Sequence, residues 1–330
     1  MPAEVPPRCG KCILLPHSQP ATPQLFAKTR VLKNLVCMQS SDSPSFLVGL
    51  IGSGIQASLS PALHEREGSR QGFRYLYRLI DLDVLKLGVD ALPELLTAAQ
   101  RMGFAGVNIT HPCKQAVIPS LDELSNDARA IGAVNTVVFH SGRRIGYNTD
   151  CWGFEKSFQQ TLGGDRRERV VQLGAGGAGA AVAHAALRLG TKQLVLFDID
   201  EAKAAALVKS LCANFGPNHA VVGEDLAQEM AHADGLIHAT PTGMEKYPGL
   251  PLPAELLRPS HWVAEIVYFP LQTELLRVAS RVGCKTVDGS GMAVFQAAGA
   301  FRLFTGVEAD SAAMLRDFEL LVQRRADGVS

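Results

Sequence analysis

Short apolar runs alternate with amphipathic segments along most of the chain, and this alternation predicts an α/β fold with largely parallel sheets covered by helices. In the first half, the segments with a strand-like apolar pattern are 46–51, 75–80, 106–110, 136–139 and 144–147. Helical patterns begin at Ser60 and continue at 92–102 and at about 120–131. Ser60 is the predicted N-cap of its helix, because Pro61 follows it in the first turn.

The second half shows the same alternation after a predicted helix at 152–161. Its predicted strands are 170–173, 193–197, 235–239, 262–267 and 285–287, and its last two predicted helices are 293–305 and 310–324. We expect these last helices to fold back across the domain boundary, so that the first domain is discontinuous in sequence.

A glycine-rich turn lies between a predicted strand and an alanine-rich helix near the middle of the chain. Its residues are Gly174, Ala175, Gly176, Gly177, Ala178 and Gly179, which form the pattern G-x-G-x-x-G. Such a turn brings backbone N–H groups at a helix N-terminus close to a pyrophosphate. The next strand ends at Asp198, nineteen residues after Gly179, where an acid would accept hydrogen bonds from an adenosine ribose. Strand, turn, helix and acid together predict a Rossmann-type dinucleotide-binding domain.

The position of this turn sets the predicted domain organisation. Residues 1–44 are rich in Pro, Ser and Gln and are expected to have little fixed structure, with Met38 as a candidate natural start. Residues 45–150, completed by about 289–330, are predicted to form the substrate-binding and catalytic domain. Residues 151–288 are predicted to form the dinucleotide-binding domain.

Composition and charge restrict the classes of partner. Lys plus Arg and Asp plus Glu both number 32, so the net charge is zero and a nucleic-acid partner is not expected. No apolar run is long enough to predict a membrane span. The seven cysteines are scattered, which favours a reducing, cytoplasmic compartment, and Cys9 and Cys12 lack the second pair that a zinc site needs. No metal site is predicted.

Three polar clusters of the first domain lie at predicted strand ends and helix starts. The first is Ser58 and Ser60, whose hydroxyls suit a carboxylate, although their spacing alone favours an N-cap. The second is Asn108, Thr110 and Lys114. The third is Asn135 with Asn148 and Asp150, where the last two are also candidate helix caps. An Asp opposite a Lys could pass a proton to or from an alcohol.

In their order, these motifs resemble those of shikimate dehydrogenases. The resemblance covers roughly 46–325 and includes S-x-S at 58–60, N-x-T-x-P-x-K at 108–114, G-A-V-N-T at 132–136, N-T-D at 148–150, the glycine turn, A-T-P-T-G-M at 239–244, Tyr268, and D-G-S-G-M at 288–292 through Gln296. The segments 55–58, 110–112 and 301–306 are most similar to the quinate/shikimate dehydrogenase branch.

The resemblance implies a role for each matching residue. Lys114 and Asp150 would be the catalytic pair in a reversible hydride transfer between a nicotinamide and shikimate, or quinate. The substrate-binding residues would be Ser58 and Ser60 for the carboxylate, and Asn108, Thr110, Asn135, Asp150, Tyr268 and Gln296 around the ring. The cofactor-binding residues would be the six residues of the glycine turn, Asp198, Thr240 and Gly291.

Two positions bear on specificity. Biosynthetic members of the family typically carry an Arg after the second nucleotide-binding strand, to meet a 2′-phosphate. Asp198 stands there in this chain and would repel that phosphate, so NAD is predicted over NADP. Ser60 is the residue that shikimate-selective relatives carry, where quinate-using ones often have Thr. Shikimate is therefore the predicted better substrate, with quinate as a second one.

Other functions remain open at this stage. A shikimate- or quinate-responsive regulator could use the same fold without catalysis, and a dehydrogenase of another cyclic hydroxy acid could use the same polar residues. The predicted partner is a small-molecule substrate. The oligomeric state, monomer or homodimer, stays open.

Overall fold

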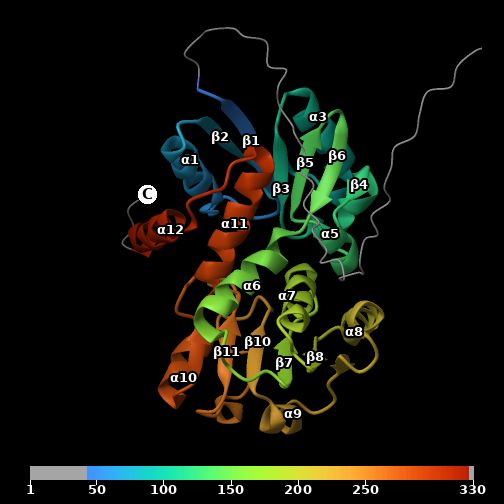
Figure 1. Ribbon diagram of the computed structural model, residues 1–330, viewed down its shortest axis with the longest axis vertical. Coiled ribbons are helices and arrows are strands. Elements are labelled where there is room, and N and C mark those ends of the chain that lie inside the picture. Colours follow the sequence, from blue (N-terminus) through green and yellow to red (C-terminus); the bar gives the residue numbers. More distant parts are fainter. Residues whose placement is uncertain (1–42, 327–330) are drawn as a thin grey trace, which may run out of the picture. The chain divides into compact units, whose positions relative to one another are not determined.

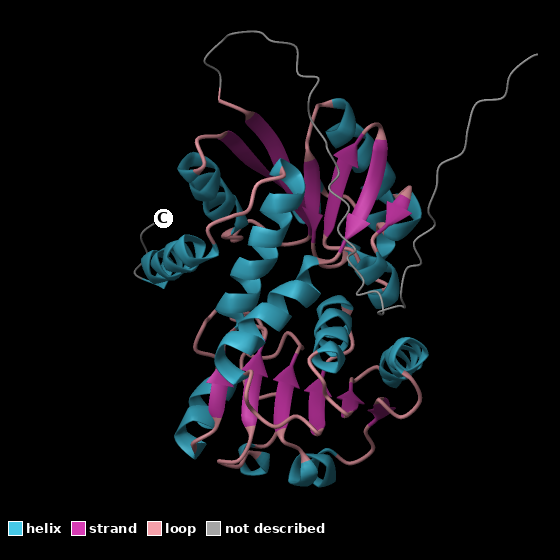
Figure 2. Cartoon of the chain, in the orientation of Figure 1, coloured by secondary structure: helices cyan, strands magenta, loops and turns pink. Residues whose placement is uncertain are grey.

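The computed structural model describes residues 43–326, which contain two six-stranded sheets. The predictions for residues 1–42, including Met38 and the Cys9 and Cys12 pair, lie outside the described residues. The α/β class predicted from the alternation of patterns is confirmed, with helices packed on both sheets (Figure 2).

The first sheet has the strand order β2-β1-β3-β5-β6-β4 (Figure 1). Its strands are β1 (Ser45–Gly52), β2 (Arg74–Asp81), β3 (Gly106–Ile109), β4 (Glu123–Leu124), β5 (Thr136–His140) and β6 (Arg143–Tyr147). β1 pairs in parallel with β2 and β3, whereas β5 runs antiparallel to β3 and β6. The helical segments of this part are α1 (Ser60–Arg70), α2 (Leu82–Leu85), η1 (Val89–Ala91), α3 (Leu92–Arg101), α4 (Cys113–Ala116), η2 (Ile118–Ser120) and α5 (Asn126–Ile131).

The predicted helix over 120–131 is wrong in its first half. Residues after η2 run extended through β4, which pairs with β6, and only α5 is helical. The Ser125 hydroxyl accepts a hydrogen bond from the Ala128 N–H at 3.1 Å and caps α5. A serine in mid-segment thus starts a new helix, because its side chain satisfies an N–H group that lacks a partner at a helix N-terminus.

The second sheet is parallel throughout, with the order β12-β11-β10-β7-β8-β9. Its strands are β7 (Arg169–Leu173), β8 (Gln193–Phe197), β9 (Ala220–Val222), β10 (Gly235–His238), β11 (Trp262–Glu265) and β12 (Lys285–Val287). The helices between them are α7 (Gly177–Arg188), α8 (Glu201–Phe215), α9 (Leu226–His232), η3 (Ala254–Leu256) and α10 (Glu274–Val282). The chain order reverses between β7 and β10, which is the point where a doubly wound sheet binds a dinucleotide.

Three further helices are α6 (Thr149–Leu162) and α11 (Gly289–Thr305), which pack against each other, and α12 (Ser311–Ala326), which packs on α11 and α1. α6 and α11 lie side by side (Figure 1), and Gly153 allows this because a side-chain carbon there would lie 2.8 Å from the Met292 carbonyl oxygen. Phe301 and Phe304 of α11 belong to the apolar core of the first sheet. The C-terminal helices therefore return to the first sheet.

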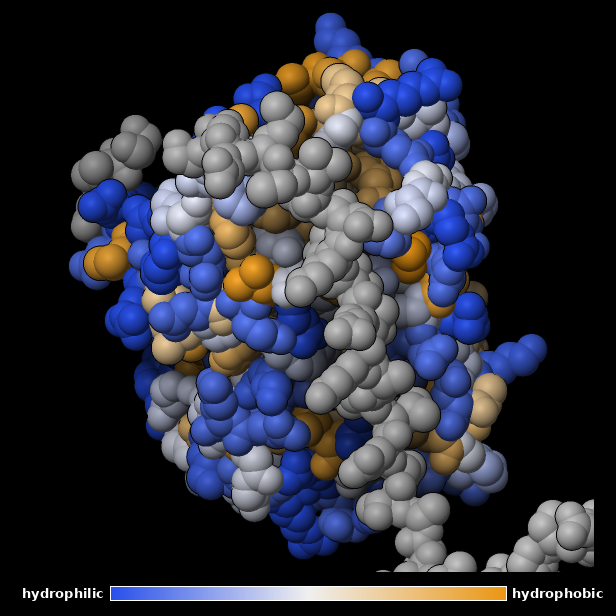
Figure 3. All heavy atoms as spheres, turned by 45° about the horizontal axis from the view of Figure 1, so that its top comes forward, coloured by the Kyte–Doolittle hydropathy of each residue, from blue (hydrophilic) through white to orange (hydrophobic). Residues whose placement is uncertain are grey.

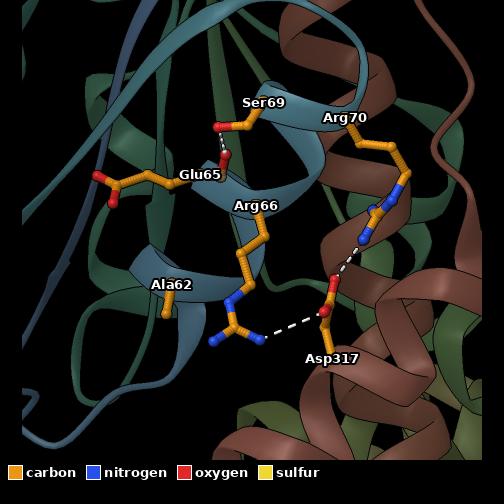
Figure 4. Close-up of a pocket in the computed structure, with 6 residues that line it drawn as sticks. All are labelled: Ala62, Glu65, Arg66, Ser69, Arg70 and Asp317. Carbon is orange, nitrogen blue, oxygen red and sulfur yellow. Dashed lines mark hydrogen bonds and ion pairs between the residues drawn. The ribbon is translucent and has the colours of Figure 1, made fainter.

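α12 is tied to α1 by charged side chains (Figure 4). Arg66 lies 3.3 Å from Asp317, and Arg70 pairs with both Asp317 and Glu67. Glu67 is buried and also accepts a hydrogen bond from the Asp310 N–H at 2.9 Å. These contacts fix the helix that carries Ser60 against the end of the chain.

Most of the surface seen in Figure 3 is polar, with apolar side chains scattered singly or in small groups. None of the helices in the described part of the chain has the length and apolar character needed to cross a membrane.

Candidate active site

Lys114 and Asp150 form the closest pair of opposite charges among the polar clusters predicted from the sequence. The Lys114 Nζ lies 2.6 Å from the Asp150 Oδ2, with Lys114 on α4 after β3 and Asp150 in the first turn of α6. Both side chains are largely shielded from solvent, with 16% and 7% of their surface exposed. A shielded pair at this distance can share a proton with a reacting alcohol.

Asp150 does not cap its helix. The side chain of Asn148 accepts from the N–H groups of Asp150 and Cys151, at 3.1 and 3.2 Å, and is the N-cap of α6. The Asp150 carboxylate thus takes no part in capping. Its second oxygen accepts from the Asn135 Nδ2 at 2.9 Å.

The side-chain amide of Asn135 makes its hydrogen bonds to other residues of the protein. Its Nδ2 also donates to the Thr149 Oγ1 at 2.9 Å, and its Oδ1 accepts from the Thr149 N–H at 2.8 Å. Both amide hydrogens therefore have partners. Asn135 holds Asp150, and a ring hydroxyl would have to replace one of these contacts to bind it.

Asn108 is likewise engaged. Its Nδ2 donates to the Asn135 carbonyl oxygen and the Thr136 Oγ1, at 3.2 and 3.0 Å, and its Oδ1 accepts from the Tyr77 hydroxyl at 2.9 Å. Thr110 follows on the same strand end and is partly exposed, with its N–H bonded to the Ile51 carbonyl at 2.9 Å. Thr110 is therefore more open to a ligand than Asn108, whose amide is buried and already hydrogen-bonded.

Ser60 is not the N-cap of α1. Leu59 occupies that position without a side-chain cap, and Ser60 is the first helical residue. The Ser58 Oγ accepts from the Ser60 N–H at 3.2 Å, and the two hydroxyl oxygens lie 3.1 Å apart. Both serines are partly exposed, so they present two hydroxyls beside an uncapped helix N-terminus, which favours an anion such as a carboxylate.

Tyr268 and Gln296 come from the loop after β11 and from α11. Tyr268 is 42% exposed, and its ring centroid lies 6.3 Å from that of Phe318 on α12. Gln296 donates to the Ala293 carbonyl oxygen of its own helix at 3.0 Å and is partly exposed.

The glycine turn has the geometry that its pattern predicts. Gly174 has a φ of 103°, and a side-chain carbon at Gly179 would lie 2.3 Å from the Gly174 carbonyl oxygen. Gly176 precedes α7 and faces open space, since no atom lies within 4 Å of where its side chain would be. Buried Gln172 donates to the carbonyl oxygens of Gly174 and Gly179, at 2.9 and 2.8 Å, and stabilises the turn.

The turn lies against Lys114. A side-chain carbon at Gly177 would be 3.5 Å from the Lys114 Cβ and Cδ atoms. On the other side of the turn, Asp198 accepts from the N–H groups of Ala175 and Asp200, at 2.7 and 2.9 Å. The Lys–Asp pair, the turn and the predicted ribose-binding acid therefore all lie near the carboxyl ends of the strands of the second sheet.

Among residues 43–326, no group of three or more His, Cys, Asp or Glu side chains has a geometry that could hold a metal ion.

Comparison with known proteins decides the family. The family model of the shikimate dehydrogenase substrate binding domain matches residues 50–137, and that of the shikimate 5′-dehydrogenase C-terminal domain matches residues 289–316. A shikimate dehydrogenase (NADP(+)) of Streptomyces avermitilis is 60% identical over 275 residues, which cover 83% of this chain and 94% of that protein. The chain belongs to the shikimate dehydrogenase family.

Other relatives are named for NAD rather than NADP. A quinate/shikimate dehydrogenase (NAD(+)) of Corynebacterium efficiens is 45% identical over 277 residues, 83% of this chain and 98% of that protein. The solved structure of quinate dehydrogenase from Corynebacterium glutamicum in complex with NAD has a TM-score of 0.79 and 44% identity, covering 84% of this chain and all of that one. The predicted family, its two-part fold and a nicotinamide cofactor are thereby confirmed.

Thr240 and Gly291, the two remaining predicted cofactor residues, differ in surroundings. The Thr240 Cγ2 would lie 3.1 Å from a side-chain carbon at Gly174, so Thr240 touches the glycine turn. Gly291 packs on α6, because a side-chain carbon there would lie 2.3 Å from the Ser157 Oγ. Close helix packing already accounts for this glycine.

Arg325 was not predicted from the sequence. Its Nη1 donates to the Ala57 carbonyl oxygen at 2.6 Å, and its guanidinium lies 3.7 Å from the ring centroid of Phe269. It thereby links the loop of Ser58 to the loop of Tyr268. An arginine near a chain end carries no sequence pattern that would have identified it.

Proposed function

We propose that this protein is a dehydrogenase that reversibly oxidises shikimate to 3-dehydroshikimate, with quinate as a slower substrate. The observation that carries the proposal is the shielded Lys114–Asp150 pair, at 2.6 Å, in contact with the dinucleotide-binding turn through Gly177. The names of the relatives, shikimate and quinate/shikimate dehydrogenases, support the same substrate class.

The proposed mechanism assigns the proton to the chain's own residues. A bound nicotinamide would accept the hydride from the alcohol carbon of the substrate. The Lys114–Asp150 pair would take the hydroxyl proton during oxidation and return it during reduction. The Asp150 carboxylate accepts a hydrogen bond from the Lys114 Nζ, and Asn135 keeps that carboxylate in place.

Substitution of Lys114 tests this assignment. We expect Lys114→Ala to lower kcat for shikimate oxidation by about a hundredfold or more, which is typical for loss of a general acid–base group. Circular dichroism and dinucleotide affinity serve as controls that the variant is folded. Unchanged turnover in a folded variant would remove Lys114 from the mechanism.

The substrate carboxylate is proposed to bind at Ser58 and Ser60. The two hydroxyls and the uncapped N-terminus of α1 support an anion there. Shikimate is preferred in this proposal because Ser60 lacks the methyl group of a threonine. Steady-state rates with shikimate and quinate measure the preference directly, and a higher kcat/KM for quinate would contradict it.

NAD is proposed as the preferred cofactor. Asp198 is fixed by two backbone N–H groups at the end of β8, and its carboxylate has lone pairs left for ribose hydroxyls but would repel a 2′-phosphate. The nearby cation Lys203 pairs with Asp200 at 3.3 Å. Initial rates with NAD and NADP at equal concentration test the preference, and faster turnover with NADP would refute it.

The organisation of the molecule completes the proposal. Residues 45–150 with about 289–330 would bind substrate, and residues 151–288 would bind the dinucleotide, in a cytoplasmic monomer or homodimer without nucleic-acid or membrane partners. Within the described residues, Cys113, Cys151, Cys212 and Cys284 are free thiols. Sedimentation velocity would decide between monomer and homodimer.

A further inference from the structure

Two ionisable side chains lie buried side by side in the second sheet, away from the Lys–Asp pair. His238 ends β10 and Glu265 ends β11, and the two residues are direct neighbours in the parallel register. They are 0% and 2% exposed. The His238 Nδ1 lies 2.9 and 3.0 Å from the two Glu265 carboxylate oxygens.

The partners of Glu265 determine which nitrogen of His238 carries hydrogen. The carboxylate accepts from the Val267 N–H at 2.9 Å and from the Thr273 hydroxyl at 3.1 Å. Thr273 donates there, because an ionised carboxylate only accepts, and its oxygen also accepts from the Leu276 N–H at the start of α10. Glu265 is therefore surrounded by donors, and the Nδ1 of His238 is the third of them.

The other ring nitrogen of His238 points to Thr240. Its Nε2 lies 2.6 Å from the Thr240 Oγ1, which also accepts from the Thr242 N–H at 3.2 Å. For a neutral imidazole with hydrogen on Nδ1, the Nε2 is an acceptor, so the Thr240 hydroxyl must donate to it. Hydrogen bonds then run in one direction from Thr242 through Thr240 and His238 to Glu265.

Thr240 is the exposed end of this chain. It is partly exposed, whereas His238 is fully buried, and its methyl group lies against Gly174 of the glycine turn. Thr240 follows β10, on the opposite side of β7 from β8 and Asp198. In a doubly wound sheet the two halves of a dinucleotide lie on the two sides of this reversal, so Thr240 is on the half opposite the adenosine.

We propose that His238, oriented by Glu265, is a positioning residue that fixes the Thr240 hydroxyl against the nicotinamide half of the dinucleotide. The pair acts through Thr240 and touches neither cofactor nor substrate. The inference rests on the proposed dinucleotide site and adds to it a residue pair that determines how one half of the cofactor is held.

A His238→Asn variant separates the two contacts of the ring. The shorter amide reaches roughly as far as the Nδ1, so it can still donate to Glu265, and it leaves Thr240 without its partner. We expect the Kd for NAD, measured by calorimetry, to rise roughly three- to tenfold, the effect of losing one buried hydrogen bond. The Kd for ADP-ribose, which lacks the nicotinamide, should stay within about twofold of the wild-type value, because only the nicotinamide half is affected.

A double-mutant cycle with Thr240→Val provides the decisive readout. If His238 acts through the Thr240 hydroxyl, the double variant binds NAD no more weakly than Thr240→Val alone, within about twofold. Losses that multiply in the double variant would overturn the proposal, as would an equal loss of affinity for ADP-ribose. His261→Asn is the matched control, because His261 is also buried but lies at the opposite end of β11, and its NAD affinity should be unchanged.

Thr240→Ser keeps the proposal testable if His238→Asn does not fold. Serine retains the hydroxyl for His238, so NAD affinity should remain within about twofold of wild type, whereas Thr240→Val should lose it. Equal losses in the two variants would overturn the proposal. A wild-type protein that binds neither NAD nor NADP would instead refute the proposed function, so the two failures are distinguishable.

Discussion

His64 makes the stability of the first sheet depend on pH. It lies on α1 with 1% exposure, and its ring centroid is 4.9 Å from that of Tyr77 and 6.2 Å from that of Phe301. Its Nδ1 is 3.2 Å from the Tyr75 hydroxyl. Burial among these rings lowers the pKa of His64 from 6.5 to about 3, because the charged imidazolium would lose its hydration.

The direction of the pH effect follows from this depressed pKa. Between about pH 6.5 and pH 3 the unfolded chain binds a proton at His64 that the folded chain does not. The stabilisation is therefore fully present above pH 6.5 and is lost as the pH falls, at up to about 1.4 kcal/mol per pH unit. From pH 7.5 to pH 5.0 the loss is about 2 kcal/mol, accumulated mainly below pH 6.5.

Urea unfolding of the wild type and of His64→Phe at the two pH values measures this loss. Other groups titrate in both proteins, so the difference between the two pH dependences isolates His64. We expect the wild type to lose about 2 kcal/mol more than the variant on going to pH 5.0. His140→Gln, at an exposed site, is the surface control. Equal losses in wild type and His64→Phe would show that the folded protein admits the charged ring.

Three further predictions concern the turn, the cofactor and the catalytic pair. Gly179→Ala should lower the unfolding free energy by about 1–3 kcal/mol, because its new methyl group meets backbone atoms. Gly176→Ala should leave the unfolding free energy unchanged and weaken NAD binding. Equal urea midpoints for the two variants would contradict this. Asp198→Ala should raise the NADP-to-NAD ratio of kcat/KM by about tenfold through loss of a like charge, and an unchanged ratio would exclude Asp198 from the preference. Asn135→Ala should lower kcat by about tenfold with little change in the Kd for NAD, because Asp150 loses a hydrogen bond; a change confined to that Kd would count against it.

Much of this structure could be predicted because its signals are local. Five of the six strands of the second sheet were predicted as short segments, with only β9 missed, and the G-x-G-x-x-G pattern with its following acid marks the nucleotide half without reference to distant residues. Lys114 and Asp150 could be paired only through the family resemblance, since 36 residues separate them and periodicity does not link them.

The features missed depend on backbone geometry and strand register, which the hydrophobic pattern does not specify. Leu59 rather than Ser60 is the N-cap of α1, because the Leu59 carbonyl oxygen accepts the first helical hydrogen bond, from the Leu63 N–H at 3.0 Å. The His238–Glu265 pair depends on the register between β10 and β11. A sequence pattern places both residues at strand ends but does not say which strands are neighbours.

The amide contacts of the site bear on how catalysis can be organised. Asn135 holds one oxygen of Asp150 while Lys114 holds the other, so the carboxylate is fixed before any substrate arrives. Asn148 caps the same helix, and that helix packs on α7, which begins at the glycine turn. A change in the turn can therefore reach Asp150 through α6 as well as Lys114 through Gly177. Because both members of the pair are tied to the element that carries the glycine turn, the fold would hold the proposed proton acceptor in a fixed position relative to a bound dinucleotide.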